Sequence, residues 1–228
     1  MRYIKCGIFA VVLIGTTITS SAALAVTVIL PEPTEASPIS GTGTSGKVSF
    51  QTASGASFIC EKATGTGEFT SGNDGHGEAH VSGCKTLGLN CNSPGAKAGE
   101  VILSDEIHYW AGLLGKELIA VAVALITKPL LIECPAAGIK MEKRGCTAGQ
   151  VPPESLNKKI KTLTGTLKQS KGKQEITEVF SPKTKSFIKC ISEISKNGGA
   201  FEEIGQEGSA TTEGFKQNGK SLEVELMF

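Results

Sequence analysis

The sequence predicts an all-β domain, a disulfide-linked antiparallel sandwich or barrel-like structure of short strands. Val48 and Phe50 alternate with polar neighbours, and so do Phe58 and Cys60, which is the pattern of half-buried strands. Gly pairs and Asx-Gly turns separate such runs about every ten residues. Glycine makes up 28 of the 228 residues, against a usual share of about 7 %. This surplus indicates tight turns.

The alternating pattern continues along the rest of the chain. Further strands are predicted near residues 65–70, 77–84, 99–103, 130–134, 138–146, 161–169, 174–180, 184–192, 199–206 and 220–227. Turn signals lie between them at Lys171-Gly172, Asn197-Gly198-Gly199 and Asn218-Gly219. The spacing therefore favours a meander of short strands.

Two segments in the middle of the chain do not alternate in this way. The apolar run 118–126 is rich in Val and Ile and ends at Thr127-Lys128-Pro129, so we expect a central strand buried on both faces. Residues 104–115 fit two structures. Ser104 resembles a helix start and Trp110 has helical spacing with its apolar neighbours, yet a strand is equally compatible.

The N-terminal 25 residues are typical of a secretion signal. Arg2 and Lys5 precede an apolar run, and Ala23-Leu24-Ala25 supplies the small residues that signal peptidase requires. The apolar run is too short to cross a bilayer as a helix, so no membrane span is expected after cleavage. The prediction is a secreted bacterial protein whose exported form begins at Val26.

The next residues, 26–46, are rich in Pro, Ser, Thr and Gly. Because such a segment buries little apolar surface, we expect a disordered linker there. The remaining residues, 47–228, then form a single β-rich domain.

Six cysteines remain after the predicted cleavage, and an even number outside the cytoplasm implies three disulfides. They are Cys60, Cys84, Cys91, Cys134, Cys146 and Cys190. Short spacing favours one pair between Cys84 and Cys91 and a second between Cys134 and Cys146, which leaves Cys60 with Cys190. No CxxC pair is present, so a zinc site built on these thiols is not expected.

One stretch resembles a known group of proteins. Gly83-Cys84, then Cys91-Asn92-Ser93-Pro94-Gly95-Ala96 and Gly99-Glu100-Val101-Ile102, followed by an apolar strand and another Cys, are similar to uncharacterised secreted proteins of high-GC Gram-positive bacteria. The resemblance covers residues 60–146. It implies a β-rich fold and an extracellular location, and it supplies no activity and no functional residue.

The segment 214–221, GFKQNGKS, matches the phosphate-binding loop letter for letter. Its context contradicts that function. Only seven residues follow Ser221, and they alternate as a strand does, so no helix can follow the loop. We predict a hairpin turn at Asn218-Gly219 and no binding of ATP.

His76, Glu78 and His80 form the best candidate for chemistry. They alternate, so on a strand their side chains share one face, where two imidazoles and a carboxylate could hold one metal ion. Two observations favour an ordinary solvent-exposed strand face over a metal site. Glycines flank these residues, and alternating polar residues are common on strands that face solvent. No Pro-Cys-x-x-Cys follows, which excludes the zinc deaminase signature.

His108 lies beside the only Trp, Trp110, and we expect it to be a packed or hydrogen-bonded structural residue. No Gly-x-Ser-x-Gly elbow is present, although a Ser-His-acid triad needs no local signature. No catalytic residue and no cofactor are assigned from the sequence.

Charge limits the partners of the protein. The net charge is +1, and Arg144 is the one Arg after residue 25, so a nucleic-acid partner is not expected. Lysines concentrate between Lys158 and Lys189. They mark either a surface for anionic cell-envelope polymers or edge strands protected from association, and the second is favoured.

The terminal alternation that ends at Phe228 resembles that of outer-membrane barrels. Only ten of the twelve aromatic residues follow residue 25, too few for two aromatic girdles. The predicted function is a secreted extracellular or cell-envelope binding or structural module, with an envelope polymer or an extracellular protein as its partner. The alternative is a secreted hydrolase that uses Glu or a metal held by His76, Glu78 and His80.

Overall fold

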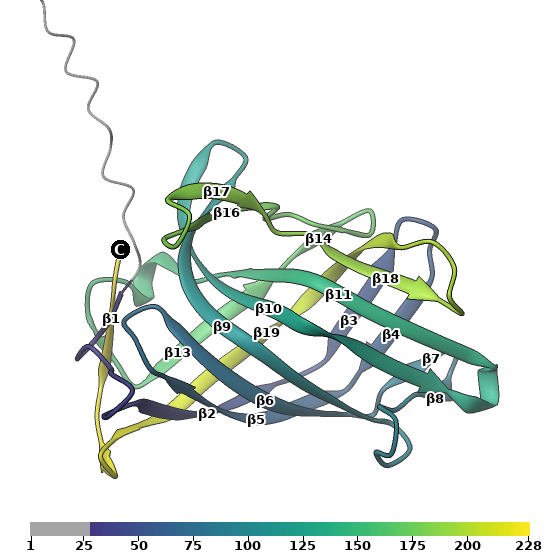
Figure 1. Ribbon diagram of the computed structural model, residues 1–228, viewed down its shortest axis with the longest axis horizontal. Helices are drawn as coiled ribbons and strands as arrows, with labels where there is room; N and C mark the ends of the chain where they lie inside the picture. The colour runs from purple at the N-terminus through teal and green to yellow at the C-terminus, as the bar shows by residue number, and fades with distance from the viewer. Residues whose placement is uncertain (1–27) are drawn as a thin grey trace, which may run out of the picture.

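The computed structural model describes residues 28–228 (Figure 1). The signal-peptide prediction for residues 1–25 lies outside these residues. Within the described chain the fold is all-β, as predicted, and short 3-10 turns at Pro135–Ala137 and Pro153–Ser155 are its only helical segments. None of the described helical segments is long and apolar enough to span a membrane.

Eight antiparallel strands close into a barrel. In the order in which they follow around the wall, they are β13 (Thr162–Leu167), β11 (Ile139–Gln150), β10 (Glu117–Cys134), β9 (Glu100–Leu114), β6 (Asp74–Ser82), β5 (Lys62–Phe69), β2 (Ile39–Ser45) and β19 (Glu202–Gln217). β19 then pairs with β13 over six residues and closes the ring. Of the two predicted architectures, the barrel is the one that forms.

The wall has one irregular seam, between β11 and β19. β13 lies between these strands at one end, where it pairs with Gln150 of β11. At the other end β18 (Ser192–Lys196) lies between them instead, paired with Gly145 of β11 and with Glu203 of β19. Between β13 and β18 the two long strands face each other without a ladder, so side chains must close the wall there.

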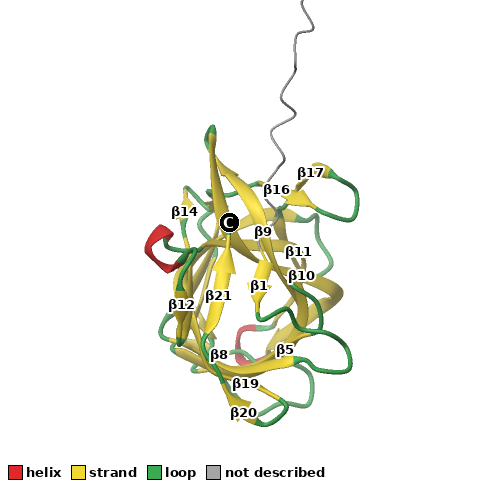
Figure 2. Ribbon diagram, turned by 90° about the vertical axis from the view of Figure 1, so that its left-hand side faces the viewer, coloured by secondary structure: helices red, strands yellow, loops and turns green. Residues whose placement is uncertain are grey.

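A small sheet made from both ends of the described chain covers one end of the barrel. β1 (Val28–Leu30) pairs with β21 (Val224–Met227), which pairs with β12 (Lys159–Ile160). These strands lie across this end of the barrel in the view of Figure 2. Ile29 and Leu226 are fully buried against the barrel core.

The prediction of a disordered linker over residues 26–46 is therefore wrong for its described part. β2 pairs with β5 through seven residues and with β19 on its other side. Its Gly and Thr residues bury little apolar surface, but their backbone groups are bonded on both edges. The domain begins before residue 47, since Ile29 and Ile39 both belong to its core.

The remaining strands extend the wall or cover it. β3 (Val48–Thr52), β4 (Ser57–Cys60), β7 (Lys85–Thr86) and β8 (Leu89–Asn90) continue outward from β19. β14 (Gln169–Ser170), β15 (Lys173–Gln174), β16 (Glu178–Ser181) and β17 (Ser186–Lys189) form two hairpins between β13 and β18, and β20 (Lys220–Ser221) pairs with β19.

Both segments in the middle of the chain are strands. In β10, Ala120 faces the barrel core, while Ile119 and Val121 pack on the outer face under residues of the β15 to β17 region. The predicted burial on both faces is confirmed for residues 119–123, whereas Leu118 is exposed and residues 124–126 are half-buried. The ambiguity over 104–115 is resolved as strand, because β9 pairs with β10 along nine residues.

The turn predictions are confirmed as well. Lys171, Asn197 and Asn218 have φ values of 52°, 51° and 53°, and each is followed by a glycine with positive φ. Such pairs suit the two-residue hairpin turns that match the twist of the strands. The segment that resembles a phosphate-binding loop is thus the end of β19 and its turn into β20.

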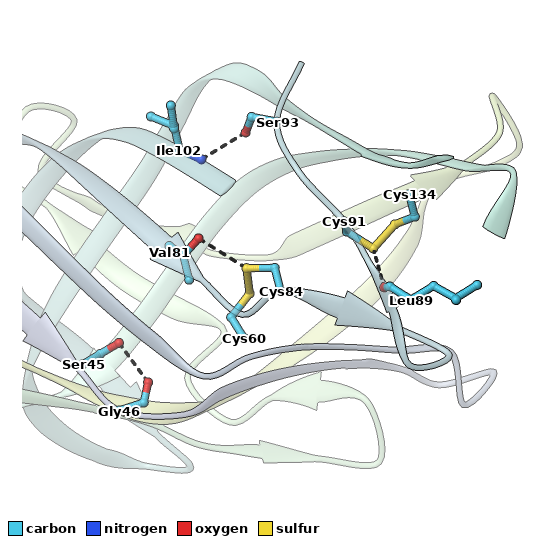
Figure 3. The surroundings of a disulfide bond; sticks show 10 residues. All are labelled: Ser45, Gly46, Cys60, Val81, Cys84, Leu89, Cys91, Ser93, Ile102 and Cys134. Carbon is cyan, nitrogen blue, oxygen red and sulfur yellow. Dashed lines mark hydrogen bonds between the residues drawn. A yellow bond between two sulfur atoms is a disulfide. The ribbon is translucent and has the colours of Figure 1, made fainter. Parts of the chain in front are cut away.

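Three cysteine pairs lie at disulfide distance, in a pairing that differs from the predicted one. Cys60 joins Cys84 and Cys91 joins Cys134 (Figure 3). Cys146 joins Cys190. The predicted bond between Cys84 and Cys91 is wrong, although their backbones are hydrogen-bonded to each other. Spacing along the chain was misleading because strand pairing, not loop length, decides which side chains meet.

Candidate functional site

The inner face of the barrel is lined by small residues on three adjacent strands. In β2, β5 and β6, every second residue faces inward, and most of these residues are Gly or Ala: Gly41, Gly43, Ala63, Gly65, Gly67, Gly75, Gly77 and Ala79. The residues between them are largely Thr, Glu and His, and those are exposed. A wall of this kind leaves space in the barrel that larger side chains would fill.

This space is a cavity of about 310 Å³. It lies between two packed clusters, because its lining takes Phe50 and Ile204 from one cluster and Phe69 and Leu163 from the other. Ala122 of β10 lines its wall. The surface is mainly apolar, and its volume falls at the lower end of the range for small-molecule pockets.

One polar cluster interrupts the apolar lining, at the seam between β11 and β19. Lys143 and Thr147 come from β11 and Gln206 comes from β19, and all three line the cavity and are more than 90 % buried. Gln206 Nε2 donates to Thr147 Oγ1 at 2.6 Å and to Ser192 Oγ at 3.1 Å. Lys143 Nζ donates to Thr147 Oγ1 at 3.4 Å. These side chains join the two strands where they share no ladder.

The predicted metal ligands lie elsewhere, on the outer face of β6. His76, Glu78 and His80 alternate and are all exposed, so they share one face as expected. His80 is held between two carboxylates, with Nδ1 3.0 Å from Glu100 Oε1 and Nε2 3.2 Å from Glu78 Oε1. Among the residues of known position, no three His, Cys, Asp or Glu side chains are grouped as a metal site.

The two carboxylates control the charge of His80. Hydrogen bonds to Glu100, and secondarily to Glu78, raise the pKa of His80, and the bond from His80 lowers the pKa of Glu100. For a raised His pKa, stabilisation is complete below the unfolded-state pKa and is lost as pH rises through the folded one. For Glu100 it is lost as pH falls through its lowered pKa. The pair therefore stabilises the fold between these two values.

We expect an NMR titration of the His80 ring to give a pKa above the ordinary value of histidine. Glu100→Gln should lower this pKa most, because it removes the stronger hydrogen-bond acceptor, and the matched Glu78→Gln should lower it less. An unshifted His80 in the unmodified protein, or a larger effect of Glu78→Gln, would contradict the geometry.

His108 is a structural residue, as predicted. Its ring stacks on Trp110 with a centroid distance of 4.4 Å, and Nδ1 lies 2.5 Å from Asp74 Oδ1. Nε2 is buried without a hydrogen-bond partner in the described chain, and it is 3.6 Å from Glu106 Oε2. No serine hydroxyl of the described chain completes a triad at this nitrogen.

The nine lysines between Lys158 and Lys189 are all exposed. They lie mostly on the β12 strand, the β14 to β17 hairpins and the loops between them. Two have acidic partners on neighbouring elements, Lys161 with Glu223 and Lys173 with Glu203. None of the nine lines the cavity.

Sequence reasoning missed the cavity and its polar cluster. A signal for the cavity is present, because Gly alternates with Thr in GTGT at 41–44 and in TGTG at 64–67. A strand whose inward positions are glycines must face either a close neighbour or a space. Lys143, Thr147 and Gln206 have no such signal, since they meet only through the seam.

We compared the chain with family models, curated proteins and solved structures, and none of them matches it. The resemblance to secreted Gram-positive proteins stays a prediction.

Proposed function

We propose that the protein is a secreted binding module that holds a small apolar molecule inside its barrel. The observation that carries this proposal is the cavity of about 310 Å³ with a mainly apolar lining. Closed barrels of eight strands have an interior just large enough either to be filled by side chains or to hold one small ligand. The inward glycines of β2, β5 and β6 favour the second use.

The disulfides support the location. Three cysteine pairs at disulfide distance are consistent with an oxidising compartment outside the cytoplasm. An apolar molecule in such a compartment needs a carrier or a receptor, because it partitions poorly into water. Binding inside the barrel, rather than on the lysine-rich outer surface, then becomes the primary interaction of this module.

The hydrolase alternative receives no specific support from the described residues. His76, Glu78 and His80 are exposed on the outer face of β6, and neither histidine lines the cavity. His80 is already engaged by Glu78 and Glu100.

A cavity-filling variant tests the proposal. A Cβ built on Gly43 meets only the Gly65 carbonyl oxygen, at 4.0 Å, so Gly43→Leu can be accommodated. Its four added carbons, at roughly 30 Å³ each, would occupy more than a third of the cavity. The matched control is Thr42→Leu, which adds an apolar group to the exposed face of the same strand, at a residue that does not line the cavity.

We expect a neutral fluorescent naphthylamine to bind the unmodified protein with enhanced emission. Gly43→Leu should weaken this binding at least tenfold, and Thr42→Leu should leave it within about twofold, with circular dichroism confirming the fold of both. No binding by the unmodified protein, or an equal loss in both variants, would overturn the proposed function.

A further inference from the structure

One buried nitrogen on the outer face of β9 has no hydrogen-bond partner in the described chain. It is Nε2 of His108, a residue that is 8 % exposed. The ring itself is fixed, since it stacks on Trp110 and its Nδ1 lies 2.5 Å from Asp74 Oδ1. A buried polar atom without a partner costs free energy, so a ligand for Nε2 would be favoured.

The contact with Asp74 decides which nitrogen of His108 can bind a ligand. A carboxylate only accepts hydrogen bonds, so Nδ1 carries the hydrogen and donates it to Asp74 Oδ1. In the neutral ring this leaves a lone pair on Nε2. At metal sites a histidine usually donates one ring N–H to a carboxylate in this way, and the carboxylate orients the ring while the other nitrogen binds the metal. His108 is therefore oriented as a metal ligand would be.

A carboxylate lies opposite this nitrogen at the distance of a second ligand. Glu106 Oε2 is 3.6 Å from His108 Nε2, which is too long for a hydrogen bond. A zinc ion about 2.05 Å from each of the two atoms would join them at an angle of about 120°, a little wider than the tetrahedral angle that zinc prefers. The Glu106 side chain is exposed, so an ion can reach the pair from solvent.

A third ligand is within reach on the neighbouring strand. His76 of β6 is directly opposite Glu106 in the register, and both side chains are exposed. The Cβ atoms of such a pair are about 4.5–5.5 Å apart, so a change of rotamer brings the His76 ring to an ion held by Glu106. Two ligands thus stand at metal-ligand separation and the third must turn, and no set of three is assembled among the described side chains.

We propose that His108, Glu106 and His76 form a binding site for a zinc-type divalent ion on the outer wall of the barrel. Two imidazoles and one carboxylate suit zinc, and water would complete the four ligands. The site differs from the one that the sequence predicted, because it keeps His76 but not Glu78 and His80, which contact each other. It joins β6 to β9 and is independent of any ligand in the cavity, so it goes beyond the proposed function.

The stacked indole supplies the readout, because Trp110 is the only Trp of the chain and its ring centroid lies 4.4 Å from that of His108. Cu²⁺ binds imidazole ligands and should quench this fluorescence, and Zn²⁺ should restore it by competing for the same ligands. The titrations use untagged protein that a chelator has freed of metal. Glu106→Gln and His76→Gln each remove one exposed ligand, and the matched control is His80→Gln, an exposed histidine on the same face.

We expect saturable, stoichiometric binding of Zn²⁺ to the unmodified protein in isothermal titration calorimetry. Glu106→Gln and His76→Gln should each weaken this binding about tenfold or more, and His80→Gln should leave it within about twofold. Asp74→Asn should weaken it about ten- to a hundredfold, because the carboxylate that orients the His108 ring is lost. Circular dichroism checks the fold of each variant, and the exposed positions of Glu106 and His76 keep the test independent of the buried ring.

Two kinds of result would overturn this site. Unchanged Zn²⁺ binding in Glu106→Gln, or an equally large loss in His80→Gln, would show that the ion is held by other residues of this face. Absence of both Zn²⁺ binding and quenching by Cu²⁺ in the unmodified protein would show that His108 instead bridges Asp74 and Glu106 as an imidazolium. Neither result bears on the cavity, which the naphthylamine titration tests separately.

Discussion

Reduction of the three disulfides is expected to unfold the domain under conditions in which the oxidised protein is stable. The bonds close loops with sequence separations of 24, 43 and 44 residues. Loop entropy assigns them about 3.5, 4 and 4 kcal/mol. The loops follow one another along the chain without overlapping, so these contributions add. Their total of about 11 kcal/mol is as large as the net stability of a typical domain, about 5–15 kcal/mol.

Urea unfolding followed by circular dichroism, with and without reductant, measures this effect. A double variant, Cys91→Ser with Cys134→Ser, should lose about 4 kcal/mol, because it opens one loop and leaves the other two closed. Peptide mapping without reduction checks the pairing. Equal urea midpoints in both conditions would contradict the stability argument, and a peptide that joins Cys84 to Cys91 would contradict the pairing.

Replacing Phe215 with Ala is expected to destabilise the domain by about 3–5 kcal/mol. Phe215 is 1 % exposed and packs with Ile29, Ile39 and Leu226 where the small terminal sheet covers the barrel. Its ring lies over Gly41, where an added Cβ would be 3.3 Å from Phe215 Cδ1. Its buried packing partners are held in the paired strands β1, β2 and β21, so we expect the cavity that the change creates to persist.

Phe187→Ala is the matched control. It deletes the same atoms from a half-exposed ring in the β16–β17 hairpin, so a loss of about 1 kcal/mol is expected. The urea midpoints of the two variants measure the two losses of stability, provided that the dependence of the unfolding free energy on urea concentration is the same in both. If Phe215→Ala cost no more than Phe187→Ala, the end of the barrel would not be packed as described.

Local patterns predicted most of the strands and turns. A period of two places His76, Glu78 and His80 on one face whatever the neighbouring strands are, and Asn218-Gly219 favours a tight turn through its own φ angles. The end of β19 shows the limit of a motif match, because the eight letters of a phosphate-binding loop fold as a hairpin when a strand follows them.

The linker and disulfide predictions were wrong for one shared reason. Both predictions judged a segment only by its own composition or by the spacing of its residues. The conformation of β2 is instead fixed by hydrogen bonds to its partners β5 and β19. Cys84 is likewise placed by strand pairing. Its partner Cys60 ends β4, which pairs with β7 directly after Cys84. Ladder bonds between distant strands are not encoded in the residues of either strand alone.

The sequence by itself determined the all-β class, the strand period and the turns, because each depends on residues within about ten positions. Only the tertiary structure decided the closure of the barrel, the cysteine partners and the cavity. Its polar cluster joins Lys143 and Thr147 to Gln206, about sixty residues away. Such contacts depend on which strands pair and at what register, and a shift of one residue would turn every inward glycine outward.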